Sequence, residues 1–575
     1  MFRARRALCV LFTFALACSQ FAPAAVALPS PASTMHATTA QGASFAIATD
    51  HYLASQTGAR VLRDGGTAVD AAIAIAYALA VTFPVAGNIG GGGFMLIHLK
   101  DGSSHFIDFR ETAPAAAYAD MYLDARGRPD ANRSTIGPLS AGVPGTVAGL
   151  EYAREHFGTL SRATLIAPAI AYARGFRIDE ADAQLFADER NWLAQFPSTK
   201  AVFLRDGKPL REGQILRQPD LEQTLRAISE RGVDGFYRGP VARALVASAK
   251  GSGGVITLAD LAGYRAVART PLTCARGADT IVTSPPPSSG GVAICEILGI
   301  VGPVGPAGGG ALRDAANAHL EIEAERRAFA DRNTALGDPD FVHAPVAQLL
   351  NPAYLARQRA SITPTAATPS SEIPGFGVHE GHNTTNFSVV DAAGNAVDVT
   401  YTLNNGFGSG FVAAGTGVLL NDEMDDFTSK PGAPNMFGLV QGTANAIAPG
   451  KRPLSSMMPT IVLDANGNPV LIAGAEGGPR IITAVLDIVR DVIDFHESIS
   501  EAVAQARVHM QWLPDLVYAE PGAFAPEVLA KLRTMGYRFK FEGAGSGANA
   551  IAVASDGTRT AAHDPRTPTG SAIAR

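Results

Sequence analysis

Cysteine and charged residues are both scarce in this chain. It has four cysteines in 575 residues, and Asp, Glu, Lys and Arg together make up 17% of it. No His/Cys cluster has zinc-site spacing; His379 and His382 do not form the i, i+4 pair that a metalloprotease helix requires. Beyond the first few residues there is no dense Lys/Arg block, and the net charge is -6. We therefore expect no metal, no other cofactor and no nucleic acid partner.

The apolar run at the N-terminus is short. Residues 7–17 are roughly a dozen apolar positions, too few to span a bilayer. Arginines precede this run and small residues ending in Ala-Val-Ala at position 27 follow it, as in a secretory signal peptide. We expect residues 1–27 to be removed and the mature protein to be exported to a bacterial periplasm. A lipoprotein box at Cys18 is the weaker alternative, because Ala15 stands where a larger aliphatic residue is usual.

Removal of this signal segment leaves two cysteines, Cys274 and Cys295. In an oxidising compartment they could form one disulfide. Their spacing does not require it, so two buried free thiols remain an equal alternative.

Apolar residues are abundant, at 47% of the chain, and are sufficient for a large core. Residues 64–83 predict a capped helix that is apolar on nearly every side and therefore buried, against a sheet. The glycine-rich residues 87–94 lack a following Gly-Lys-Ser/Thr, so they predict a tight turn instead of a phosphate loop. Residues 95–99 and 104–109 predict a strand pair.

Helical patterns dominate residues 145–335, notably 219–232 and 312–332, and a proline-rich loop at 284–291 interrupts them. Residues 362–383 are rich in Thr, Pro, Ala, Ser and Gly, as expected of a connection. Strands at 460–463 and 470–474 and helices at 480–493 and 525–535 complete the pattern. One large layered α/β domain fits better than several small ones.

A β-hairpin follows the connection. Residues 386–390 and 396–403 predict strands, joined by the turn sequence Asp-Ala-Ala-Gly-Asn. If Val390 faces Ala396, antiparallel pairing places Thr384 opposite Thr402. Two hydroxyl groups would then meet at one end of the hairpin.

The hairpin sequence TTNFSVVDAAGNAVDVTYTLN (384–404) resembles the γ-glutamyltransferase family, a branch of the N-terminal-nucleophile hydrolases. The similarity continues in the family's order through DFRETAP (108–114), GVPGTVAG (142–149), SPPPSSGG (284–291), NDEMDDF (421–427), KRPLSS (451–456) and DPR (564–566). The resemblance implies an αββα sandwich made of two subunits that are cut from one precursor.

The predicted nucleophile is Thr384. A threonine hydroxyl needs an adjacent base, and in this class of enzyme the base is the nucleophile's own α-amine. Because an internal threonine has no free amine, the precursor must break the Asn383–Thr384 bond by attack of the Thr384 hydroxyl on the Asn383 carbonyl. We expect a large subunit, residues 28–383, and a small catalytic subunit, residues 384–575, that stay associated as a heterodimer.

The resemblance also implies the binding residues. A γ-glutamyl group carries a carboxylate and an ammonium, so its pocket needs charges of both signs; glutathione is the expected donor, and amino acids or dipeptides the acceptors. The implied roles are Arg110 for the carboxylate, Glu423 and Asp426 for the ammonium, Asn404, Ser455 and Ser456 for further hydrogen bonds, Thr402 for the nucleophile's hydroxyl, Gly477 and Gly478 for the oxyanion hole, and Phe437 as the gate of a lid at 431–442.

Five residues depart from the family pattern. Phe437 stands where the aromatic gate of the lid is commonly Tyr. Asn386 replaces a common His, Asp398 a small residue, and Glu476 and Pro479 flank the glycine pair in place of the common Pro and Ser. Because Asn386 and Asp398 are diagonal neighbours on one face of the hairpin, we predict that they form a polar pair. Two other functions remain open, a cephalosporin or glutaryl acylase that uses the same Thr384, and an inactive exported binding protein.

Overall fold

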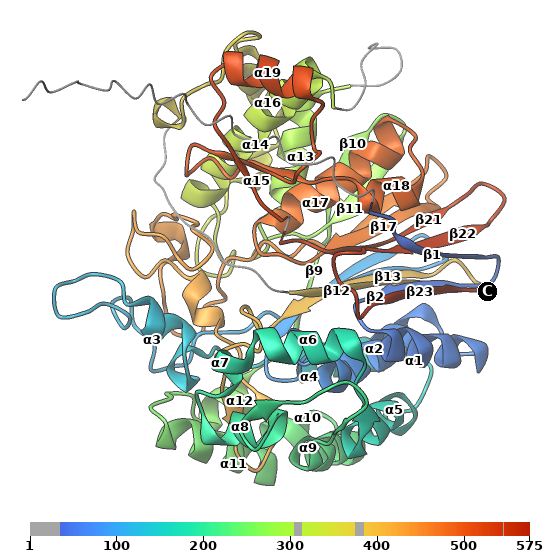
Figure 1. Ribbon diagram of the computed structural model, residues 1–575, viewed down its shortest axis with the longest axis vertical. Coiled ribbons are helices and arrows are strands. Elements are labelled where there is room, and N and C mark those ends of the chain that lie inside the picture. Colours follow the sequence, from blue (N-terminus) through green and yellow to red (C-terminus); the bar gives the residue numbers. More distant parts are fainter. Residues whose placement is uncertain (1–34, 304–312, 374–383, 544) are drawn as a thin grey trace, which may run out of the picture.

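The computed structural model describes residues 35–303, 313–373, 384–543 and 545–575. The predicted signal segment 1–27 and Asn383 therefore lie outside the described residues. In the centre, two seven-stranded sheets pack face to face, and helices cover both outer faces (Figure 1). This arrangement is the predicted αββα sandwich. Within the described residues, no helix is long and apolar enough to cross a membrane.

The first sheet, called sheet A, is antiparallel throughout. Its strands, in spatial order, are β1 (Thr38–Gly42), β22 (Arg559–His563), β21 (Ala548–Val553), β17 (Pro469–Ala475), β16 (Thr460–Leu463), β11 (Asp279–Thr283) and β10 (Leu272–Arg276).

The second sheet, called sheet B, is also antiparallel. Its strands, in order, are β23 (Ser571–Ala574), β2 (Ala46–Thr49), β12 (Thr385–Val390), β13 (Ala396–Thr402), β3 (Gly92–His98), β4 (Ser104–Asp108) and β9 (Val267–Arg269). In both sheets, strands from before and after residue 384 lie side by side. β12, the first strand after this point, is paired on both edges.

The β12–β13 hairpin has the predicted register. Val390 pairs with Ala396 and Thr385 with Tyr401, so the next position outward is Thr384 opposite Thr402. Alternate side chains of a strand point to opposite faces. Phe387 and Val389 therefore pack in the core between sheet B and its helices, whereas the even-numbered positions of β12 face sheet A. Thr384 continues this even-numbered row.

Helices of the outer face of sheet B are drawn in the lower half of Figure 1. The helices α1 (Tyr52–Arg63), α2 (Ala68–Thr82) and α4 (Thr146–Phe157) contact the sheet, and α5 (Arg162–Arg174), α9 (Pro219–Arg231), α10 (Val233–Tyr237) and α11 (Gly239–Gly251) form a further layer. Every residue of α2 is buried, as predicted, and Thr67 and Asp70 form a capping box at its start.

Sheet A is covered by helices drawn in the upper half of Figure 1. These are α13 (Gly290–Val301), α17 (Arg480–Val489) and α18 (Ile499–Ala504), with α14 (Ala315–Ala335), α16 (Pro352–Ala360) and α19 (Pro526–Thr534) packed outside them. The predicted helix at 480–493 ends at Val489 and continues as a π-helix, Arg490–Asp494.

A disulfide joins Cys274 of β10 to Cys295 of α13. Of the two alternatives that the cysteine spacing left open, a disulfide or two free thiols, the structure has the disulfide. The bond attaches an edge strand of sheet A to the helix beside it. The strands β9, β10 and β11 lie inside a region where the sequence predicted mainly helices, so that part of the prediction was incomplete.

Candidate active site

Thr384 and Thr402 lie at one end of the sandwich and line a common cavity. Their exposed fractions are 4% and 3%. The cavity is about 20 Å³, enough for a water molecule. Its lining consists of Arg110, Arg332, Thr384, Thr402, Asn404, Asp426, Phe437, Leu439, Ser455, Ser456, Met457, Gly478, Pro479 and Ile481.

The end of β13 is held by residues 88–91, the part of the predicted turn at 87–94 that precedes β3. A Cβ atom on Gly91 would lie 2.0 Å from the Thr402 carbonyl oxygen, so only glycine fits there. Asn88 donates from Nδ2 to the same carbonyl at 2.9 Å. After the strand, the backbone amide of Asn404 donates to the Thr402 hydroxyl at 2.9 Å. Asn404 adopts a φ of 82°, which asparagine tolerates. The predicted turn thus positions the hydroxyl that faces the cavity.

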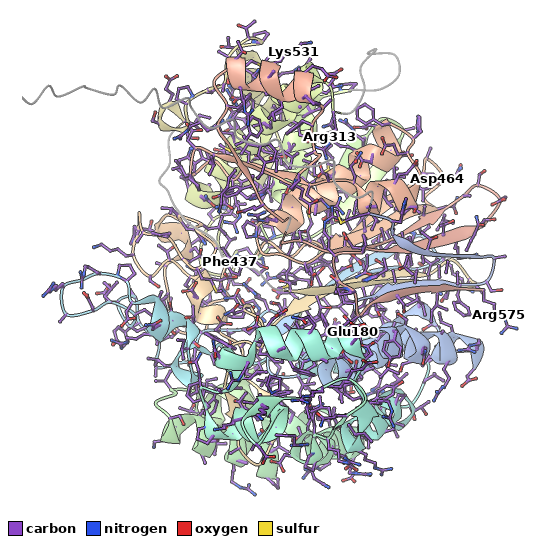
Figure 2. The ribbon with its side chains drawn as sticks, viewed as in Figure 1. Glu180, Arg313, Phe437, Asp464, Lys531 and Arg575 are labelled. Carbon is purple, nitrogen blue, oxygen red and sulfur yellow. A yellow bond between two sulfur atoms is a disulfide. The ribbon has the colours of Figure 1, made fainter. Side chains whose placement is uncertain are left out.

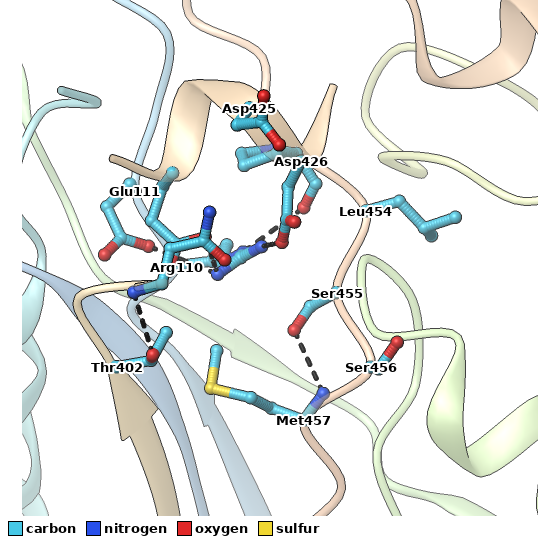
Figure 3. A network of polar contacts seen from close by, with 12 residues as sticks. Arg110, Glu111, Thr402, Asp425, Asp426, Leu454, Ser455, Ser456 and Met457 are labelled. Atoms are coloured by element: carbon cyan, nitrogen blue, oxygen red, sulfur yellow. Dashed lines mark hydrogen bonds and ion pairs between the residues drawn. The ribbon is translucent and has the colours of Figure 1, made fainter. Parts of the chain in front are cut away.

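Arg110 brings positive charge to the cavity from the end of β4. It is 1% exposed, and its guanidinium forms an ion pair with Glu423. A second ion pair joins it to Asp426 (Figure 3). Glu111 lies 3.6 Å from the same guanidinium. Glu423 is not among the described residues that line the cavity, so Asp426 presents the carboxylate on that side. The predicted cation and anions are therefore together, and they pair with each other.

Burial shapes the protonation of these acids. It raises the pKa of Glu423 well above its ordinary value and that of Asp426 above its own, and Arg110 opposes both shifts. The pKa of Glu111 rises to about 8 for the same reason. Three buried carboxyl groups around one guanidinium therefore favour retention of a proton among them near neutral pH.

Ser455 and Ser456 face the cavity from the segment after Arg452 (Figure 3). The proline-rich loop holds this segment, because the amide and hydroxyl of Ser289 both donate to the Ser455 carbonyl oxygen, at 2.8 and 2.6 Å. Arg332 of α14 donates to the hydroxyl of Ser456 at 2.9 Å and to that of Ser289 at 2.8 Å. Among the described residues, Arg332 has no carboxylate within ion-pair distance, and burial lowers its pKa to about 10.

Gly477 and Gly478 lie between β17 and α17 with φ values of 113° and 58°, which L side chains rarely adopt. Gly478 lines the cavity, and a Cβ atom on it would lie 2.6 Å from the ring of Phe437. The ring therefore packs directly against Gly478. Phe437, labelled in Figure 2, is 3% exposed and closes this side of the cavity.

Below the cavity lies the predicted polar pair. Asn386 donates from Nδ2 to Oδ1 of Asp398 at 3.1 Å, which confirms the prediction. Ser388 donates to the same oxygen at 2.9 Å, and the amide of Thr460 in sheet A donates to the other carboxylate oxygen at 3.0 Å. Asp398 therefore links the hairpin to the opposite sheet.

The comparisons with known proteins agree with this geometry. The family model described as Gamma-glutamyltranspeptidase matches residues 54–574. The chain belongs to this family. The glutathione hydrolase proenzyme of Pseudomonas sp. (strain A14) is 51% identical over 498 residues, which cover 86% of each chain, and that of Escherichia coli (strain K12) is 46% identical with 89% of each covered.

A solved structure also matches this γ-glutamyltranspeptidase-family chain over nearly its whole length. The cephalosporin acylase from Bacillus halodurans has a TM-score of 0.80 and 26% identity, covering 97% of this chain and 99% of that one.

Sequence reasoning missed several residues that line the cavity, above all Arg332. This arginine lies in the last turn of a long helix, where a basic residue is normally assigned to the helix C-terminus. The apolar residues Met457 and Ile481 gave no signal that separates them from core positions. Gly477, which was predicted, adjoins the cavity without lining it.

Proposed function

We propose that this protein is a γ-glutamyltransferase and glutathione hydrolase that uses Thr384 as its nucleophile. The observation that carries the proposal is the position of Thr384: it stands at the head of a strand paired on both edges, in one cavity with a guanidinium and a carboxylate. A γ-glutamyl group, which has an α-carboxylate and an α-ammonium, matches those two charges.

In the proposed reaction, the α-amine of Thr384 accepts the hydroxyl proton while Oγ attacks the γ-carbonyl carbon. A free α-amine has a pKa of about 7.7 to 8.0 and can act as a base near neutral pH. Backbone amides of Gly477 and Gly478 stabilise the oxyanion. The amide bond breaks as its nitrogen takes the proton, leaving a γ-glutamyl ester on Thr384. Water, or the amine of an amino acid or dipeptide, then attacks this ester.

Substrate recognition requires Arg110 and its acids to rearrange. We propose that the α-carboxylate binds Arg110 and the hydroxyls of Ser455 and Ser456, while Asp426, with Glu423 behind it, binds the ammonium and Asn404 adds a hydrogen bond. Phe437 and Leu439 of the lid at 431–442 line the cavity and are buried, so we propose that the lid moves when the substrate enters. Thr402 orients the nucleophile.

Maturation is part of the proposal. Cleavage at Asn383–Thr384 creates the α-amine and yields residues 28–383 and 384–575 as two subunits. The sheets support their continued association, because β12 lies between β2 and β13 while β13 also pairs with β3. Export to the periplasm through the signal segment 1–27 is consistent with the Cys274–Cys295 disulfide.

The test uses purified full-length protein and Thr384→Ala. Wild type should resolve into two bands on a denaturing gel and release p-nitroaniline from γ-glutamyl-p-nitroanilide, faster with a dipeptide acceptor if transfer occurs. The variant should remain one chain without activity, because cleavage and catalysis need the same hydroxyl. Two subunits from Thr384→Ala would refute the mechanism.

An acylase is the second candidate, favoured by the similarity to the cephalosporin acylase from Bacillus halodurans. A glutaryl group lacks the α-ammonium that Asp426 would bind. Glutaryl-p-nitroanilide offered beside the γ-glutamyl compound distinguishes the two functions, and we expect preference for γ-glutamyl. An uncut chain without activity on either substrate would instead indicate a binding protein.

A further inference from the structure

Asp50 is hydrogen-bonded to Thr385, the residue that follows the nucleophile. It follows β2 in the sequence, so the predicted cleavage would leave it in the large subunit while Thr384 begins the small one. It is 1% exposed, and its Oδ2 accepts hydrogen bonds from the Thr385 hydroxyl at 2.6 Å and from the Asn386 amide at 3.2 Å. Asp50 is not among the described residues that line the cavity. Its two hydrogen bonds to β12 reach Thr385 and Asn386, the two residues that follow the nucleophile.

Asn549 of β21 also forms a hydrogen bond with Asn386. Its Nδ2 donates to Oδ1 of Asp50 and to the carbonyl oxygen of Asn386, both at 2.7 Å. The backbone amide and carbonyl of Asn386 are thus held by two side chains that contact each other, that of Asp50 next to sheet B and that of Asn549 in sheet A. Two fixed groups leave the start of β12 little freedom to shift or rotate.

The hydrogen bonds continue toward the glycine pair. The ring of His563 bonds through Nδ1 to Oδ1 of Asn549 at 2.8 Å and through Nε2 to the carbonyl oxygen of Thr567 at 2.6 Å. The Thr567 hydroxyl donates to Glu476 at 2.8 Å, and Glu476 immediately precedes Gly477. One continuous series of contacts thus runs from the neighbour of the nucleophile to the neighbour of the oxyanion glycines.

His563 also lies close to the start of the series, with Nδ1 3.9 Å from Oδ1 of Asp50. Burial raises the pKa of Asp50 and that of Glu476, the carboxyl groups at the two ends of the series.

We propose that Asp50 is a positioning residue that, through Thr385 and this hydrogen-bonded series, sets the distance and orientation of Thr384 relative to Gly477 and Gly478. The proposal rests on the proposed function. Attack requires the nucleophile and the oxyanion donors to be correctly placed together, and displacements near 1 Å can reduce rates by about 100-fold. A residue that sets this geometry should affect turnover more than substrate binding.

The first test is Asp50→Asn. This change nearly preserves the shape of the side chain. It replaces one carboxylate oxygen, which accepts hydrogen bonds, with an NH2 group that would face the donors of Thr385, Asn386 or Asn549. We expect kcat for γ-glutamyl-p-nitroanilide to fall roughly 10- to 100-fold, KM to change less than about twofold, and cleavage at Asn383–Thr384 to slow. The matched control is Asp70→Asn. Asp70 is also a buried carboxylate that accepts a threonine hydroxyl, from Thr159 at 2.6 Å, but it caps α2 away from the cavity. This control should lower Tm without lowering kcat of the folded enzyme.

A milder pair of variants separates positioning from folding. Thr385→Val removes only the hydroxyl that Asp50 accepts, whereas Thr385→Ser keeps it. We expect the valine variant to lose kcat with KM unchanged and the serine variant to retain most of it. Equal activity of these two variants would overturn the inference, as would equal kcat for Asp50→Asn and Asp70→Asn. A wild-type protein that neither cleaves itself nor hydrolyses the substrate would instead refute the proposed function.

Discussion

Asn386 and Asp398 form a hydrogen bond beneath the nucleophile, although neither residue follows the family pattern that the chain resembles. The Nδ2 to Oδ1 distance is 3.1 Å, and both side chains are buried between the two sheets. Asp398 adds a bond from the amide of Thr460 in sheet A. The pair therefore fastens the strand that carries Thr384 to the opposite sheet.

We predict that Asn386→Ala destabilises the protein more than Asn386→Ala combined with Asp398→Ala. The single change removes a donor from a buried carboxylate, which costs roughly 1 to 3 kcal/mol. Urea unfolding is measured in the Thr384→Ala background, which stays one chain, and gel analysis follows maturation of the cleavable forms. Asn466→Ala, on an exposed turn, is the control. Strictly additive effects of the two substitutions would show that the pair is not coupled.

The pair should also give stability a pH dependence of known sign. Burial raises the pKa of Asp398 from 3.8 to about 7. Between these values the folded protein holds a proton that the unfolded chain has released, so stability falls as the pH rises, by at most about 1.4 kcal/mol per pH unit.

Comparison with Asp398→Asn isolates this contribution, because the amide does not titrate. Relative to that variant, the wild-type sequence should become less stable from about pH 4 to pH 7 and then level off. Both are measured by urea unfolding in the uncleavable background. A difference that stays constant, or one that grows with pH, would contradict the prediction.

Gly474 of β17 has no side chain, and the side chains of Asn386 and Asp398 fill the space that one would need. A Cβ atom at this position would lie 2.0 Å from Nδ2 of Asn386 and 2.7 Å from Oδ2 of Asp398. We expect Gly474→Ala to destabilise the protein by about 1 to 3 kcal/mol, as overpacking of a core does, and to slow maturation. Gly251→Ala is the control, because open space surrounds that glycine at the end of α11. Similar unfolding midpoints for the two variants would rule out the steric argument.

Arg110→Lys should raise KM for γ-glutamyl-p-nitroanilide by about tenfold or more, because an ammonium cannot replace a guanidinium that contacts two carboxylates at once. Self-cleavage should be largely intact, since it needs no bound substrate. Steady-state kinetics and a denaturing gel measure the two effects, with the exposed Arg243→Lys as a control. An unchanged KM would remove Arg110 from the substrate site.

The sequence predicted the parts of the fold whose contacts are local. The β12–β13 hairpin carries its register in its own turn, and α2 carries its cap and its apolar faces in one continuous segment. By contrast, β9 has three residues, and the partners of β11, β21 and β22 include β16, β17 and the N-terminal strand β1, so no local signal marks those pairings. The β10–β11 hairpin was missed although its pairing is local, across Gly277 and Ala278.

The same distinction applies to the site. The resemblance named many of the residues that line the cavity. Asp50 and Arg332 instead contact their partners across long sequence separations, and nothing near them in the sequence indicates these contacts. The disulfide could not be predicted either, because whether Cys274 and Cys295 meet depends on how β10 packs against α13.

Both sheets contain strands from the two predicted subunits, and this affects whether the enzyme can refold after maturation. While the chain is whole, pairing β12 with β2 and β13 with β3 closes loops within one molecule. Once Thr384 becomes a chain end, the same pairings must form between two separate molecules, with the added loss of translational freedom. Maturation would then leave the native contacts in place while removing the route by which they formed. A mature enzyme that unfolds would have to find its partner at the prevailing concentration, so its persistence would depend on how slowly it unfolds.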